Sequence, residues 1–160
     1  MEIYNKSALP APDALLAFVG APRRLVFQPG EQLFRFATIV SPTFRGNEIF
    51  SSPWWIPQAT YRQIAQTAHG TGTSTVEVAR SRMAIATPWN PAMDWLIIVE
   101  LTKPVYAWVG PTRPQPLSGA ADRSVMLLGN FDQACVPGLA PPGATASEAA
   151  TLTYFGSAVA

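Results

Sequence analysis

Serine and tryptophan side chains cluster in the stretch GNEIFSSPWWIPQATYRQI, residues 46–64. Ser51 and Ser52 are separated from Trp54 and Trp55 by a single proline. Flat indole rings can stack on nicotinamide or adenine, and small hydroxyls can hydrogen-bond an amide or a ribose hydroxyl. The stretch therefore indicates a site for a nucleotide-like ligand. In an extended strand the two indoles point to opposite faces, which leaves open that one of them belongs to the core.

A second candidate is Arg35, which lies inside the apolar run LFRFA. Strand alternation places it on the face of Leu33 and Ala37, opposite two phenylalanines. Its guanidinium is a permanently charged, planar fork that can bind a pyrophosphate through two parallel hydrogen bonds. The alternative is a structural ion pair with a buried acid such as Glu48 or Glu100.

The stretch FDQACVP contains Asp132 and Gln133, and taken by itself it favours an ordinary amide on the surface of a strand for Gln133. His69 is the only histidine and Cys135 the only cysteine, so we expect neither a Cys/His metal site nor an internal disulfide. Nucleophile-elbow, P-loop and dinucleotide-fingerprint motifs are not found in the sequence.

The composition narrows the class of protein. A chain of 160 residues with 48% hydrophobic residues is sufficient for one domain with an ordinary core. The net charge of +1, from 11 basic and 10 acidic residues, gives no broad field for a nucleic acid. No apolar stretch reaches the roughly 20 residues of a membrane span. Glu2 stands where a signal peptide has basic residues, so we expect a cytoplasmic protein, or one secreted without a cleaved signal.

The elements that must position these residues are mostly strands. We expect an N-terminal arm over residues 1–22 and a single α+β domain over 23–160. Capping-box spacing and one apolar face predict a helix from Thr60 to about His69. Aromatic and β-branched runs bounded by turn residues predict strands on both sides of Pro29-Gly30, Pro104 and Gly129-Asn130, and at 151–160. In TGTSTVEVARSRMAIA, residues 71–86, the capping-box spacing of Ser74 and Glu77 predicts a short helix or turn followed by a strand. This order favours a strand-rich, split β-sheet core with one or two short helices over regular βαβ alternation.

Three patches, taken in their order along the chain, resemble the ADP-ribosyltransferase fold, whose members use NAD. Arg35 in LFRF matches an arginine that binds the phosphate or ribose side of NAD. The segment Phe50-Ser51-Ser52 matches a serine segment that shapes the nicotinamide pocket. Gln133 stands where the family has a glutamate that engages the ribose and supports the oxocarbenium ion.

The resemblance implies an NAD-binding ADP-ribosyltransferase or NAD glycohydrolase-like domain of the effector or toxin kind, with NAD as substrate and no metal. Ser52 would then support the ribose, Trp54 or Trp55 would cover the base, and Gln133, or Asp132 beside it, would address the ribose. A protein acceptor or a cognate inhibitor would be the partner.

The glutamine is a departure from the family pattern, because an amide supplies no negative charge to a cationic transition state. It favours an alternative, a non-catalytic binding or protein-interaction module on the same scaffold. A small assembly protein with exposed tryptophans is a third class.

Overall fold

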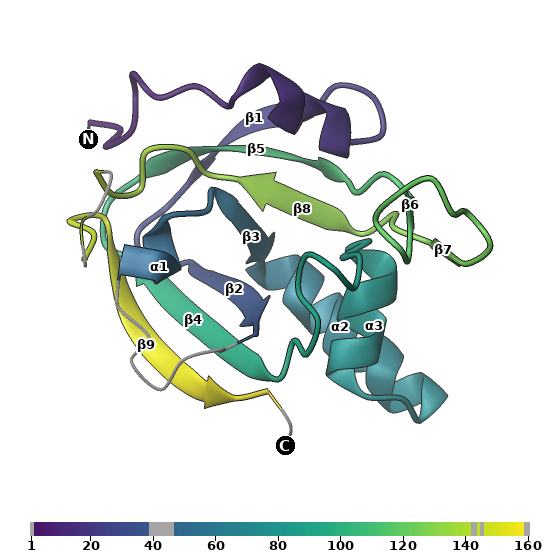
Figure 1. Cartoon of the computed structure of the whole chain (residues 1–160). Coiled ribbons are helices and arrows are strands. Elements are labelled where there is room, and N and C mark those ends of the chain that lie inside the picture. Colours follow the sequence, from purple (N-terminus) through teal and green to yellow (C-terminus); the bar gives the residue numbers. More distant parts are fainter. Residues whose placement is uncertain (1, 39–46, 142–143, 145, 159–160) are drawn as a thin grey trace.

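An antiparallel β-sheet, curled around an apolar interior, forms the centre of the molecule (Figure 1). The computed structural model describes residues 2–38, 47–141, 144 and 146–158. Within these residues the sheet has seven strands in the order β1-β5-β8-β3-β2-β4-β9. They are β1 (Arg23–Phe27), β2 (Gln32–Ala37), β3 (Trp54–Pro57), β4 (Trp95–Leu101), β5 (Val105–Pro111), β8 (Asp132–Cys135) and β9 (Ala150–Ser157). The α+β class expected from the sequence is confirmed.

Short helices and one small hairpin complete the described part of the chain. They are the 3-10 helix η1 (Pro12–Ala17), α1 (Asn47–Phe50), α2 (Gln58–Thr71), α3 (Thr75–Arg82) and the paired strands β6 (Gln115–Pro116) and β7 (Met126–Leu127). No helix among these residues is long and apolar enough to cross a membrane.

Two local predictions, the start of the long helix and a strand after the short one, need correction. The long helix begins at Gln58 with Pro57 as its N-cap, so Thr60 is a buried residue inside α2 and caps nothing. The strand expected after the short helix does not form, because residues 83–94 make turns instead. The cap of α3 agrees with the sequence, since the Ser74 hydroxyl accepts from the Glu77 backbone N–H at 3.1 Å.

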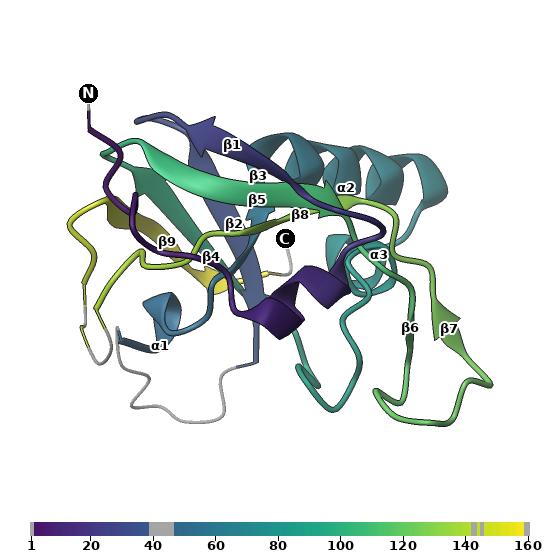
Figure 2. The same ribbon diagram turned by 90° about the horizontal axis from the view of Figure 1, so that it is seen from above.

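Strand alternation divides the apolar residues into two cores, one on each side of the sheet. The inner core contains Leu33, Trp55 and Val99 and receives Ile49 from α1. The outer core contains Phe34, Phe36 and Ile56 from the sheet together with Ile64, Ala68, Val78 and Ala79 from α2 and α3. Figure 2 accordingly shows α1 well apart from α2 and α3.

The N-terminal segment, described from residue 2 to residue 22, is attached to the sheet near Asn5 and again near Phe18. The Asn5 side chain donates to the carbonyls of Tyr106 and Pro137, at 3.0 and 2.8 Å. Phe18 is fully buried and forms a β-bridge with Thr112, just beyond β5. The segment predicted as an arm therefore supplies part of the packed structure.

Candidate functional site

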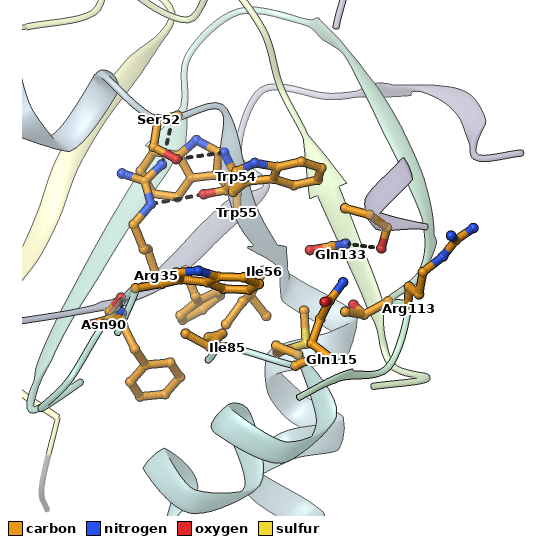
Figure 3. A pocket seen from close by; sticks show the side chains of 17 residues that line it. Arg35, Ser52, Trp54, Trp55, Ile56, Ile85, Asn90, Arg113, Gln115 and Gln133 are labelled. Carbon is orange, nitrogen blue, oxygen red and sulfur yellow. Dashed lines mark hydrogen bonds between the residues drawn. The ribbon is translucent and has the colours of Figure 1, made fainter. Parts of the chain in front are cut away.

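A pocket of about 330 Å³ opens beside the sheet, between the turns that follow α3 and the end of η1 (Figure 3). This volume lies at the lower end of the range for small-molecule sites. Strands β2, β3 and β8 supply one side, and the segments after α3 and β5 supply the other. The lining residues are Ala17, Phe34, Arg35, Phe36, Ser52, Trp54, Trp55, Ile56, Met83, Ala84, Ile85, Trp89, Asn90, Thr112, Arg113, Gln115 and Gln133.

Most of the residues singled out in the sequence meet at this pocket. Arg35, Ser52, Trp54, Trp55 and Gln133 all line it, although they come from three separate stretches of the chain. The structure does not bring the other two candidates to the lining. Ser51 is exposed, and Asp132 neighbours Gln133 on β8, where alternation turns it to the opposite face.

Gln133 is held in one orientation by the N-terminal segment. Its Nε2 donates to the Ala17 carbonyl at 3.0 Å, across 116 residues of sequence. Because that partner only accepts, the amide nitrogen must face Ala17, and the amide oxygen is turned toward the pocket (Figure 3). The pocket therefore presents an acceptor, suited to a hydroxyl or N–H of a ligand.

Arg35 uses most of its guanidinium on the backbone of its own chain. Nε donates to the Trp54 carbonyl at 2.9 Å, one terminal nitrogen donates to the Ser52 carbonyl at 2.8 Å, and the other to the Ile49 carbonyl. The guanidinium also lies 3.7 Å from the centre of the Trp55 ring. Three of its five N–H groups are thus engaged, and they fix the segment from α1 to β3.

The environment of Arg35 also bears on its charge. Burial lowers the pKa of Arg35 from its usual high value to about 9. The side chain therefore stays protonated at neutral pH, as three charge-assisted hydrogen bonds require. Of the two acids considered as its partners, Glu100 is exposed, and the side chain of Glu48 lies outside the described residues.

The two adjacent tryptophans have different surroundings, as alternation predicts. Trp55 is only 2% exposed and belongs to the inner core. Trp54 is half-buried, and its ring lies 5.6 Å from that of Phe18, measured between ring centres. Trp54 is therefore the indole of this pair that is available to a ligand, with the N-terminal segment supporting it.

Sequence reasoning missed the wall of the pocket that follows β5. Arg113 and Gln115 line it, within the stretch TRPQP. The Arg113 backbone N–H donates to the Ala17 carbonyl at 2.9 Å, and its Nε lies 3.3 Å from the Phe18 carbonyl. The Arg113 side chain is otherwise exposed, and its guanidinium points outward from the pocket (Figure 3). An arginine between prolines was the available signal, but such a loop carries no periodicity that would place it.

The electrostatic character of the pocket follows from its lining. Arg35 and Arg113 are its charged members, and no carboxylate is among the described residues that line it. Among all residues that the structure describes, no three His, Cys, Asp or Glu side chains are placed to hold a metal ion together. The site suits an anionic ligand that also has a flat ring and hydroxyl donors.

No protein-family model matches the sequence, and no curated protein matches it. Two solved structures have a similar arrangement of the chain. A chain in the structure of Tne2 in complex with Tni2 is 14% identical, with 85% of this chain and 91% of that chain covered and a TM-score of 0.49. A chain in the structure of Rhs1-CT in complex with its cognate immunity protein RhsI1 is 11% identical, with 82% and 76% covered and a TM-score of 0.48. At these values the likeness assigns neither a family nor an activity.

Proposed function

We propose that the pocket binds NAD as its substrate and that the protein cleaves the bond between nicotinamide and ribose, as an NAD glycohydrolase or an ADP-ribosyltransferase. One observation carries the proposal. Arg35, Ser52, Trp54 and Gln133, chosen from separate stretches for this chemistry, line a single pocket. Its positive charge, indole ring and amide acceptor match the phosphates, base and ribose of a dinucleotide.

Each residue has a role in this proposal. The Trp54 ring covers the nicotinamide, and the Gln133 amide oxygen accepts a hydrogen bond from a ribose hydroxyl. Arg113 lines the pocket and is exposed, so its long side chain can turn to meet a phosphate that extends out of the pocket. Arg35 acts mainly as a positioning residue, because its bonds to the Ser52 and Trp54 carbonyls hold both residues at the pocket.

The reaction is a substitution at the C1′ atom of the nicotinamide ribose. In the glycohydrolase form, the C1′–N bond breaks, nicotinamide leaves as a neutral molecule, and the oxygen of water bonds to C1′. The products are nicotinamide, ADP-ribose and one proton. In the transferase form, a nucleophile of a protein acceptor replaces water, and that acceptor, like a cognate inhibitor, would have to reach the mouth of the pocket.

A second candidate function is binding without catalysis. The observation that favours it is the lining itself, in which no described residue is a carboxylate. An amide oxygen gives a developing oxocarbenium ion only a partial negative charge, so the stabilisation of that transition state is weaker than with a glutamate. A module of this kind binds NAD and releases no nicotinamide.

The test measures nicotinamide release from NAD and the melting temperature with and without NAD. The wild-type protein is compared with Gln133→Ala and with the control Gln63→Ala, which changes an exposed glutamine on α2. We expect release and a higher melting temperature for the wild type and the control. At NAD concentrations 100-fold above the dissociation constant, the stabilisation is about 2.7 kcal/mol. We expect Gln133→Ala to lose most of both effects.

The outcomes separate the candidates. Stabilisation by NAD without release of nicotinamide supports the binding module. A wild-type protein that neither releases nicotinamide nor melts at a higher temperature with NAD overturns both versions.

A further inference from the structure

Trp89 combines two properties that rarely occur together. It lines the pocket, yet 58% of its surface is exposed. Trp54, by contrast, is half-buried among lining residues, and Trp55 belongs to the inner core. Trp89 therefore presents a large aromatic surface at the open side of the pocket, where a ligand can cover it.

The turn that carries Trp89 is tied to the rest of the molecule on several sides. The Arg80 guanidinium donates to the carbonyls of Ile85, Asn90 and Pro91 at 3.0, 2.8 and 2.9 Å. The Asn90 side chain donates to the Phe36 carbonyl at 2.9 Å, which joins the turn to β2. A residue on a turn held in this way is preorganised, and little conformational entropy is lost when a ligand binds it.

The indole itself rests against a glycine. A Cβ on Gly119 would stand 3.2 Å from Trp89 Nε1 and 3.5 Å from its Cε2, and 3.1 Å from the Ala86 Cβ. Contacts this short mean that a Cβ added at position 119 displaces the indole or the Ala86 side chain by a few tenths of an ångström. The backbone around Gly119 therefore sets the place of the ring.

We propose that Trp89 is the stacking platform for the adenine ring of the dinucleotide, an inference that rests on the proposed binding of NAD. The pocket is small, so it encloses about one half of a dinucleotide and leaves the other at its mouth. Trp54 and Gln133, both half-buried, take the end that is cleaved. The exposed Trp89 then receives the other base, and stacking on an indole suits any flat heterocycle.

The first experiment measures dissociation constants for NAD, AMP and nicotinamide mononucleotide by calorimetry, with both nicotinamide ligands supplied as analogues whose nicotinamide–ribose bond cannot be cleaved. The wild-type protein is compared with Trp89→Ala and Trp89→Phe. We expect Trp89→Ala to lower the affinity for NAD and for AMP by about tenfold, which is the effect of losing one stacked base. Nicotinamide mononucleotide should bind to Trp89→Ala as well as it binds to the wild-type protein. Trp89→Phe keeps a ring and should recover most of the affinity for AMP.

A second pair of variants moves the indole without removing it. Gly119→Ala is matched by Gly72→Ala, because the two glycines have φ angles of 70° and 68°, and only Gly119 has atoms within 4 Å of the added carbon. Both variants carry similar backbone strain, so a difference between them reports the contacts of the added carbon at position 119. We expect only Gly119→Ala to lower the affinity for AMP.

The results distinguish the role of Trp89 from the proposed binding of NAD on which it rests. A wild-type protein that binds none of the three ligands overturns the proposed function. Binding of NAD by the wild type, with AMP unaffected by Trp89→Ala, overturns the role of Trp89 alone. A loss confined to nicotinamide mononucleotide overturns the assignment to adenine.

Discussion

Arg35 shows how one side chain can link the inner core to the pocket. Its guanidinium ties together the carbonyls of Ile49, Ser52 and Trp54 and stacks on Trp55. Carbonyls beside a buried cation lose water and gain charge-assisted hydrogen bonds in exchange. The sequence predicts that this side chain binds a phosphate, whereas its contacts indicate a structural role. The two roles must be separated by measurement.

The first prediction concerns the stability of an Arg35→Ala variant. The free energy of unfolding should fall by about 3 kcal/mol, because three carbonyls lose a charged donor in a buried place. Arg35→Lys should recover little, since an ammonium cannot reproduce the fork of three donors. Urea denaturation measures both, with Arg62→Ala, an exposed change on α2, expected within about 0.5 kcal/mol of wild type.

A different result would change the role of Arg35. An Arg35→Ala protein with wild-type stability and no stabilisation by NAD would make this residue a direct ligand contact.

At the scale of elements, the pocket wall after β5 depends on its contact with the turn before β8. The Gly129 backbone N–H donates to the Ser81 carbonyl at 2.8 Å, and the Asn130 N–H donates to the Thr112 carbonyl at 2.8 Å. A Cβ on Gly129 would stand only 2.5 Å from the Thr112 carbonyl oxygen. Glycine is thus required here both by its φ of 62° and by the close approach of the backbone.

The second prediction compares two alanine substitutions at left-handed glycines. Gly129→Ala should lower the free energy of unfolding by about 3 kcal/mol or more, from backbone strain plus the clash with a carbonyl. Gly72→Ala, at the end of α2 with no atoms near the added carbon, should lower it by about 1 kcal/mol. Chemical denaturation of both variants measures the difference, and equal losses would mean that the wall can shift without cost.

Considered as a whole, the molecule packs part of its N-terminal segment against the sheet beside the pocket. Phe18 is fully buried, faces the Trp54 ring and approaches Gly110, where an added Cβ would lie 3.2 Å from it. The next carbonyl toward the N-terminus, that of Ala17, orients Gln133. Folding of the first 22 residues and formation of the pocket are therefore coupled.

The third prediction tests this coupling with Phe18→Ala. The cavity left beside Trp54 should lower the free energy of unfolding by about 4 kcal/mol and weaken any stabilisation by NAD. Leu16→Ala, at a residue 64% exposed two positions away, should change neither. Thermal denaturation with and without NAD provides both readings. A Phe18→Ala protein as stable as wild type would mean that residues 1–22 are a dispensable arm.

Much of the fold could be predicted from local patterns. The run Trp95–Leu101 is rich in β-branched residues and apolar on both faces, which predicts a strand, and the Ser74 cap indicates where α3 starts. Alternation also determines that Trp54 and Trp55 face opposite sides of the sheet. These properties depend on neighbours in sequence, so one sequence is enough to show them.

The composition of the pocket was decided by the tertiary structure. The Gln133 amide meets a carbonyl 116 residues away, and Arg113 enters the wall through a loop without periodicity. Arg35 finds its partners among carbonyls, which every residue carries and no pattern distinguishes. Contacts of this kind depend on how the elements pack. The sequence alone determined most of the strands and the two longer helices, because these depend on neighbouring residues, whereas their packing was decided by the tertiary structure.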